Sequence, residues 1–375
     1  GYGQAPYGGP GYGRQGGPPA PKPGVIPLRP LGLGEILDGA FSSIRRNPKA
    51  TLGVAAILMT ITGVISAVVS QVWLNLQGGV TLPRQGQVVT ATQAGHIFRQ
   101  VLINVLPPAL ISLVLAFLVQ VVLSGVLTAV IGRSVLGQQI SPRQAWSLAG
   151  PRLLRLLLAT VLTVLAVLSP SIVLGLVLWL CSLASAPVGV YVAVGVPGFF
   201  AAIAATAWLF TMFSLAAPAV ILEGETPARA MGRSWRLVRR SFWRVFGILL
   251  LTAIIVGVAG GILQLPFAVI AGVLGNAASG RGLGLLATII SVIGGIAAGT
   301  LTRPVAAGVT VLLYVDMRMR KEGLDLALRS ATESGFTGEE FASVWRPPSG
   351  HSYPPGPPVP APGTPPPAAG APPPW

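Results

Sequence analysis

Long intervals without any charged side chain dominate this chain. Between charged residues they cover positions 50–83, 100–132, 156–222, 245–280, 282–302 and 304–315. A charge at the centre of a bilayer costs at least about 2.5 kcal/mol, and a spanning helix needs about 20 predominantly apolar residues. The third interval is long enough for two helices, with a turn near Ser185 to Gly189. We therefore predict membrane spans near residues 50–74, 103–132, 153–183, 192–222, 245–274 and 285–315.

These spans predict the fold class, an all-α polytopic bundle of about six transmembrane helices with amphipathic interfacial helices, over residues 28–330. Residues 1–27 are rich in Gly, Pro and Tyr, and residues 331–375 are rich in Pro. Neither composition buries enough apolar surface to fold, so we expect two disordered tails. The start lacks the basic cluster and short apolar core of a signal peptide, so the first hydrophobic run is expected to stay as an anchor.

Basic residues lie on one side of the predicted spans. All but four of the 25 lysines and arginines precede span one, follow span six, or lie in the loops after spans two and four. The exceptions are Arg84, Arg99, Arg281 and Arg303. Because Lys and Arg near span ends stay in the cytoplasm, we expect both termini and the two Arg-rich loops to be cytoplasmic.

The second Arg-rich loop contains the clearest amphipathic pattern. At 100° per residue, its apolar positions fall within about 80° of one another and its arginines occupy the opposite side. The apolar positions are Met231, Trp235, Val238, Phe242 and Val245. The arginines are Arg229, Arg233, Arg236, Arg240 and Arg244. We predict a helix along the membrane surface whose Trp235 and Phe242 enter the lipid and whose arginines bind anionic head groups.

The start of this helix recurs in the chain. Thr226 and Pro227 form an N-cap and first-turn pair, and Ser141 and Pro142 repeat it in the preceding basic loop. The segment around Phe41 aligns without gaps to that around Trp235. We interpret the chain as three degenerate units, each a surface helix followed by a two-span hairpin.

Composition sets further limits. Of 375 residues, 52% are hydrophobic and 9% charged, against roughly a quarter charged in soluble proteins, and the mean hydropathy is +0.72. The formal net charge is +15, and the basic residues that produce it lie beside the membrane spans. This position favours anionic lipid over nucleic acid as the partner. Arg greatly outnumbers Lys, and Gly, Ala, Pro and Val are frequent, a bias that indicates a high-GC bacterial genome. We therefore expect the spans to lie in a bacterial cytoplasmic membrane. One cysteine and two histidines predict no metal site and no cofactor.

A few polar residues are candidates for chemistry. Arg303 lies about 20 Å from the cytoplasmic end of span six, followed by Pro304, and either binds an anion or extends outward to lipid phosphates. Glu223, Asp316 and Arg318 are charged candidates at the cytoplasmic membrane edge. For the paired carboxylates Glu223 with Glu225 and Glu35 with Asp38, charge balance beside arginines is favoured over acid–base catalysis. The GYGRQG run in residues 11–16 lacks the strand and helix of a dinucleotide site. Gly257-x-x-x-Gly261 and Gly295-x-x-x-Gly299 predict close helix packing.

Three runs resemble a family of six-span actinobacterial proteins named for the membrane domain of glycerophosphoryl diester phosphodiesterase. The runs are LRPLGLGEILDGAFSSIRRNP, SLAAPAVILEGETPARAMGRSWRLVRRSFWRVFG and LLYVDMRMRKEGLDLAL. The resemblance covers roughly residues 26–330 and implies an all-helical membrane domain. Family enzymes that cleave glycerophosphodiesters use an appended barrel with paired histidines and metal-binding carboxylates. Because Pro-rich sequence stands where that barrel would follow, the resemblance implies no catalysis here.

Three functional hypotheses follow. The favoured one is a non-catalytic accessory or scaffold protein that organises anionic lipids or protein partners through its basic helices. The second is a transporter, channel or lipid-moving protein that uses Arg303 and the Gly-rich helices. The third is a membrane-embedded enzyme that acts on lipid head groups through Glu223, Asp316 and neighbouring arginines.

Overall fold

A computed structural model describes residues 26–27, 29–77, 90–135, 137–277, 281–333 and 345. These residues form helices and turns without a strand, which confirms the all-α prediction. The α-helices are α1 (Leu33–Arg46), α2 (Val54–Gln77), α3 (Ala91–Asn104), α4 (Leu106–Ser134), α5 (Pro142–Ala149), α6 (Leu153–Leu183), α7 (Val188–Phe213), α8 (Ala216–Pro218), α9 (Pro227–Val238), α10 (Phe242–Ala277), α11 (Arg281–Glu322) and α12 (Leu324–Glu333). Two π-helical segments, η1 (Lys49–Gly53) and η3 (Ala219–Glu223), and a 3₁₀ turn, η2 (Gly150–Arg152), connect them.

Six helices in the described residues are long and apolar enough to cross a membrane. They are Lys49–Leu76, Thr92–Ser134, Pro142–Leu183, Val188–Glu223, Phe242–Gly275 and Leu283–Glu322. Each contains one predicted span, so the number and order of spans are confirmed. The expected turn inside the longest interval is also present, because α6 ends at Leu183 and Ser185 takes a left-handed φ of 51° before α7.

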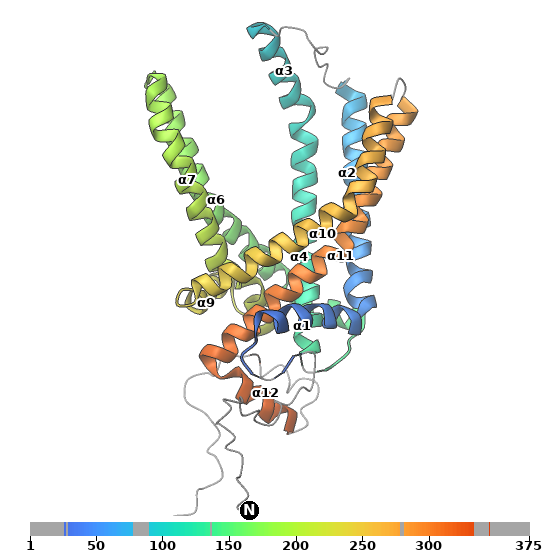
Figure 1. Ribbon diagram of the computed structural model, residues 1–375, viewed down its shortest axis with the longest axis vertical. Coiled ribbons are helices and arrows are strands. Elements are labelled where there is room, and N and C mark those ends of the chain that lie inside the picture. The colour runs from blue at the N-terminus through green and yellow to red at the C-terminus, as the bar shows by residue number, and fades with distance from the viewer. Residues whose placement is uncertain are drawn as a thin grey trace, which may run out of the picture.

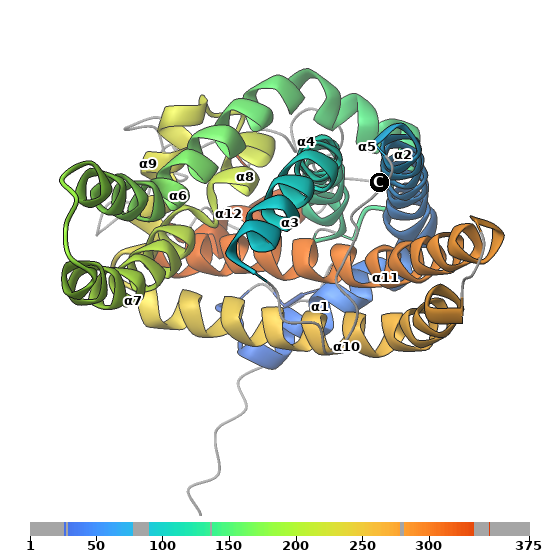
Figure 2. The same ribbon diagram turned by 90° about the horizontal axis from the view of Figure 1, so that it is seen from above.

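The spans converge at one end of the bundle and diverge toward the other (Figure 1). We call the converging end the basic end, because α1, α5, α9 and the ends of α4, α10 and α11 bring most arginines there. Seen along the bundle, α10 and α11 run side by side, and the α6–α7 hairpin stands apart from them (Figure 2). The buried core follows this geometry. The second half of α4, η3 and the last turns of α11 contribute many of its members, and the buried faces of α1, α5, α9 and the start of α10 add others.

The short helices rest on the bundle with their apolar faces. The buried side of α1 packs against α11, where a Cβ added at Gly308 would lie 2.9 Å from the Cβ of Ala40. In α9, Ala230, Leu237 and Val238 are buried, and the helix contacts α6, α7 and α8. The chain turns after Val238 and starts α10 at Phe242. The single continuous helix predicted through Val245 is therefore wrong, because α9 ends at Val238 and a turn separates it from α10.

The contacts of Trp235 show how α9 rests on the bundle. Trp235 is half-buried and its ring packs on Trp208 and Phe213, with centroids 5.2 and 5.8 Å away. Trp235 therefore rests partly on α7, and its entry into the lipid interface, like that of Phe242, stays a prediction. The predicted helix starts are confirmed, because Thr226 and Ser141 immediately precede α9 and α5, each with Pro in the first turn.

The predicted glycine packing is only partly correct. A Cβ added at Gly299 would lie 2.9 Å from the sulfur of Met59 on α2, so Gly299 does permit a close approach. Gly257 and Gly261 have no neighbouring atom within 4 Å of such a Cβ, so they do not pack a helix. The face of α10 that meets α11 instead contains Gly260, whose Cβ would lie 3.6 Å from Thr302.

Candidate functional site

Asp316 occupies the basic end of α11 and is completely enclosed, with 0% of its side chain exposed. Its Oδ1 accepts hydrogen bonds of 2.8 Å from the backbone N–H of Leu31 and from Nε of Arg320. Its Oδ2 accepts from Nη2 of Arg244 at 3.1 Å. The carbonyl of Leu31 accepts from Arg244 at 2.7 Å and from Arg320 at 2.8 Å. One carboxylate and one peptide group thus join the segment before α1 to α10 and α11.

Glu223, at the end of η3, is also completely enclosed. It forms ion pairs with Nε of Arg233 and, at 3.3 Å, with Nη1 of Arg318, and the hydroxyl of Tyr314 donates to its Oε1. Oε2 of Glu322 lies 2.7 Å from Nη2 of Arg233 and 3.0 Å from Nε of Arg318. The two acids and two arginines alternate in a ring that joins η3, α9 and α11, so each buried charge faces an opposite one.

We call these seven charged residues the acid–arginine network: Glu223, Arg233, Arg318, Glu322, Asp316, Arg244 and Arg320. Burial by itself lowers the pKa of Arg233, but the hydrogen bond and charge of Glu223 and the hydrogen bond to Glu322 raise that pKa above its ordinary value. The two carboxylates thus stabilise the charged form of Arg233. Two of the predicted edge residues, Glu223 and Arg318, lie in the ring. The third, Asp316, belongs to the second cluster, with Arg244 and Arg320.

The network also corrects the predicted lipid-facing arginine stripe. Arg233 is buried, at 8% exposure, and points into the protein. Arg244 belongs to a different helix, α10, and contacts Asp316 and Leu31. Arg233 departs from the predicted face because its side of α9 meets Glu223 and Glu322. Arg244 departs from it because α9 ends at Val238 and the chain turns before α10. Whether the remaining arginines of the stripe bind lipid stays a prediction.

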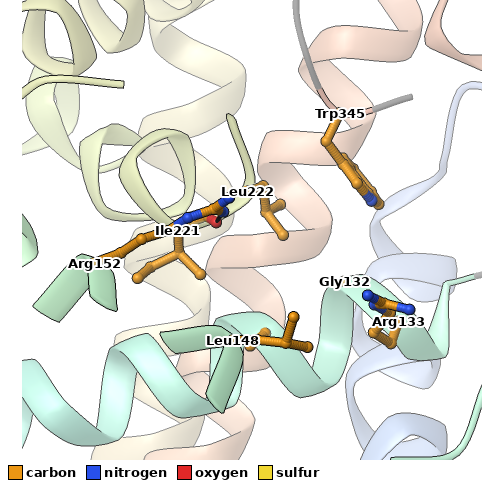
Figure 3. A pocket seen from close by; sticks show the side chains of 8 residues that line it. Gly132, Arg133, Leu148, Arg152, Ile221, Leu222 and Trp345 are labelled. Atoms are coloured by element: carbon orange, nitrogen blue, oxygen red, sulfur yellow. Dashed lines mark hydrogen bonds between the residues drawn. The ribbon is translucent and has the colours of Figure 1, made fainter. Parts of the chain in front are cut away.

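A small cavity of about 60 Å³ lies beside the network, lined by Arg133, Arg152, Leu222 and Trp345 among others. Figure 3 shows these side chains around it. Arg152 donates to the carbonyl of Ile221, so it caps the end of η3. Trp345 is 4% exposed, and its backbone carbonyl accepts a 3.0 Å hydrogen bond from Arg318. This residue falls within the segment predicted to be a disordered tail, yet it contributes to the core.

Other arginines at the basic end are exposed: Arg229, Arg236, Arg239 and Arg240. Three of them, Arg236, Arg239 and Arg240, surround a hollow of about 520 Å³ together with Lys321. We call these four residues the cation hollow. None of the ion pairs formed within the described residues includes a member of it. The hollow therefore has the chemistry of an anion site and the network does not.

Arg303 lies on α11, next to Pro304, and remains exposed. Its Nη1 donates a 3.0 Å hydrogen bond to the side-chain oxygen of Gln120 on α4. The neutral amide of Gln120 thus accepts one hydrogen bond from Arg303. The positive charge of Arg303 has no acidic partner among the described residues. Anion binding by Arg303 stays a prediction.

Sequence reasoning missed several members of these sites. Asp316 and Arg320, and Arg318 and Glu322, stand four residues apart on one helix, a spacing that would have indicated two pairs. Tyr314 carried no such indication, because its partner Glu223 is 91 residues away. Arg239 and Lys321 meet only because the turn after α9 approaches the end of α11.

The six membrane-spanning helices and the buried charge network at their converging end define a polytopic helical membrane protein. Residues 182–334 match the family described as the membrane domain of glycerophosphoryl diester phosphodiesterase. The match includes η3, α9, α10 and α11, and therefore all of the acid–arginine network and the cation hollow. Comparisons with curated proteins and with solved structures gave no match.

Proposed function

We propose that this chain is a non-catalytic accessory protein of the bacterial cytoplasmic membrane that holds anionic lipids, and protein partners, at its cytoplasmic face. The observation that carries this proposal is the sorting of charge at the basic end. The enclosed acids Glu223 and Asp316 have arginine partners inside the protein, whereas Arg229, Arg236 and Arg240 are exposed. Exposed cations beside membrane spans attract anionic head groups by about 1 kcal/mol each.

The absence of catalysis in this proposal has a physical basis. A general base needs a carboxylate that can take up a proton from a substrate within hydrogen-bond distance. Both oxygens of Asp316 already accept from arginines, and Glu223 is enclosed by Arg233, Arg318 and Tyr314. An enzyme at this position would have to break these pairs first.

The proposed orientation places the basic end in the cytoplasm, and cysteine labelling tests it. With Cys181 replaced by Ser, a cysteine at Val188 should react with an impermeant maleimide in whole cells. Val188 is 78% exposed in the α6–α7 turn at the opposite end. A cysteine at Ser147, exposed on α5, should react only after the cells are opened. The reverse pattern would place the basic end outside.

The binding itself is tested by purifying the full chain in native lipid discs and identifying bound lipids and proteins by mass spectrometry. We expect anionic lipids to be enriched over the bulk lipid of the same membrane. A lipid composition equal to bulk, with no protein that copurifies stably, would reject the proposal.

The contact between Arg303 and Gln120 supports a second candidate function, transport of an anion or a lipid along α4 and α11. A cation at membrane depth is costly unless it faces a polar path or a ligand. The test is flux of anions and of labelled lipid in proteoliposomes. Transport predicts that Arg303→Lys keeps part of the flux and Arg303→Leu abolishes it. Absence of flux in the unaltered protein would reject this alternative.

A further inference from the structure

The cation hollow combines two helix ends and a turn. Arg236 is in the last turn of α9, Arg239 and Arg240 form the turn before α10, and Lys321 lies near the end of α11. Four positive side chains around about 520 Å³ repel one another. That repulsion is removed when an anion occupies the space between them.

Lys321 is held in position by the fold. Its Nζ donates a 2.5 Å hydrogen bond to the carbonyl of Leu237, in the last turn of α9. This carbonyl belongs to the end of a helix, where a cation interacts favourably with the helix dipole. An ammonium group has three donors, so the bond to Leu237 leaves two for a ligand. Lys321 therefore provides a fixed charge, and the three arginines provide planar donor groups that match phosphate oxygens.

The nearest acid does not neutralise the hollow. Glu322 follows Lys321 directly, but its carboxylate is 2.7 Å from Arg233 and 3.0 Å from Arg318 on the network side. Since Glu322 is engaged there, the four cations lack a carboxylate partner among the described residues. At the end of α11, Glu322 thus pairs with Arg233 and Arg318. The four cations of the hollow remain available for an anion from outside the chain.

Aromatic side chains place the hollow at the membrane interface. Trp243 follows Arg240 by three residues and is 78% exposed, and its ring contacts Phe242 and Phe246 at centroid distances of 5.3 and 6.2 Å. Tryptophan concentrates at the level of the lipid head groups. An anion that reaches the hollow at this depth is the phosphate of a lipid head group.

We propose that Arg236, Arg239, Arg240 and Lys321 form a specific binding site for the phosphate group of a membrane lipid, with Trp243 as the adjacent interfacial anchor. This inference rests on the proposed function and deepens it, because it replaces a general electrostatic attraction by one saturable site. Of the predicted stripe, the site keeps Arg236 and Arg240, leaves out Arg229, Arg233 and Arg244, and adds Arg239 and Lys321.

The experiment uses the full chain in discs of neutral phosphatidylcholine, titrated with short-chain phosphatidic acid and followed by tryptophan fluorescence. We expect saturable binding that Arg239→Gln weakens about tenfold, the effect of one lost charge-assisted hydrogen bond. Lys321→Gln should weaken it similarly, while Lys321→Arg restores most of it. The matched control is Arg143→Gln, an exposed arginine of α5 outside the hollow, which should bind as the unaltered protein does.

Further arms distinguish the sources of the phosphate and the two proposals. Inorganic phosphate should compete only weakly with phosphatidic acid. Trp243→Ala should weaken the binding of phosphatidic acid but not that of inorganic phosphate. Equal affinity of the unaltered protein for inorganic phosphate and phosphatidic acid would overturn the lipid assignment. Equal weakening by Arg239→Gln and Arg143→Gln, or linear uptake without saturation, would overturn the site. The proposed function would survive that result if native discs still enrich anionic lipid. It fails separately if the unaltered protein shows no such enrichment.

Discussion

The acid–arginine network and the cation hollow are adjacent and use the same residue type for different purposes. Arg233 and Arg236 stand three residues apart on α9, yet Arg233 is 8% exposed between two carboxylates and Arg236 faces the open hollow. In the network, the buried charges of Glu223, Arg233, Asp316 and Arg318 are stable inside the protein only because their partners are present. In the hollow, the charges remain hydrated and do not need a partner to let the chain fold. The difference predicts that stability depends on the network and anion binding depends on the hollow.

The largest effect is expected for Glu223→Gln. This change removes the charge that pairs with Arg233 and Arg318, both of which stay buried. Breaking one partner of a buried pair destabilises by about 3–5 kcal/mol. Thermal and SDS-induced unfolding in detergent measures the loss. The control is Glu225→Gln. Glu225 lies two residues further along the chain, is half-buried and has no ion-pair partner among the described residues, so the free energy of unfolding should change by less than about 0.5 kcal/mol. Similar losses in both variants would show that the network is not what stabilises this end.

A smaller effect is expected for Asp316→Asn. Arg244 and Arg320 are each 35% exposed, so solvent screens part of this interaction, and we expect a loss of about 2 kcal/mol. Because Asp316 also accepts from the N–H of Leu31, hydrogen exchange at Leu31 should become faster. Asp38→Asn, an exposed acid on α1, should leave both quantities unchanged. Unaltered exchange at Leu31 in Asp316→Asn would contradict the role of Asp316 in joining the segment before α1 to α10 and α11.

Replacing two glycines near the network by alanine should change the stability of the protein in opposite directions. Gly224 follows Glu223 with a left-handed φ of 75°, so Gly224→Ala should destabilise by about 1 kcal/mol and displace the end of the network. Gly232 lies inside α9 with no atom within 4 Å of an added Cβ. Gly232→Ala should therefore stabilise by about 0.5–1 kcal/mol. Melting temperatures of the two variants, measured in the same detergent, check the sign; a shift in the same direction for both would refute the argument.

The smallest effect on stability is expected in the hollow itself. Arg240→Gln removes an exposed cation without a carboxylate partner among the described residues, so the free energy of unfolding should change by less than about 0.5 kcal/mol. A slight gain is consistent with reduced repulsion of Lys321. The same unfolding measurement as for Glu223→Gln applies. A loss of several kcal/mol would mean that the hollow, like the network, is structural.

Much of the architecture could be predicted from local sequence. Charge-free intervals identified all six spans, because a spanning helix satisfies its own backbone and only needs apolar length. Thr226 and Ser141 identified the starts of α9 and α5, because N-cap and first-turn preferences depend on neighbouring residues alone. The amphipathic projection failed after Val238, because it assumed a continuous helix through a segment that turns.

The sequence by itself determined that this protein spans a membrane six times and that its cations gather at one end, since both properties follow from the order of apolar and charged residues. Only the tertiary structure decided which cations are free. Glu223 is 91 residues from Tyr314 and 95 residues from Arg318, and Lys321 reaches the turn after α9 only when α11 packs beside it. An arginine is structural or available for a ligand according to the carboxylates that packing places around it. Spacing within α11 indicates only the Asp316–Arg320 and Arg318–Glu322 pairs, whereas the pairs of Arg233 and Arg244 join separate elements.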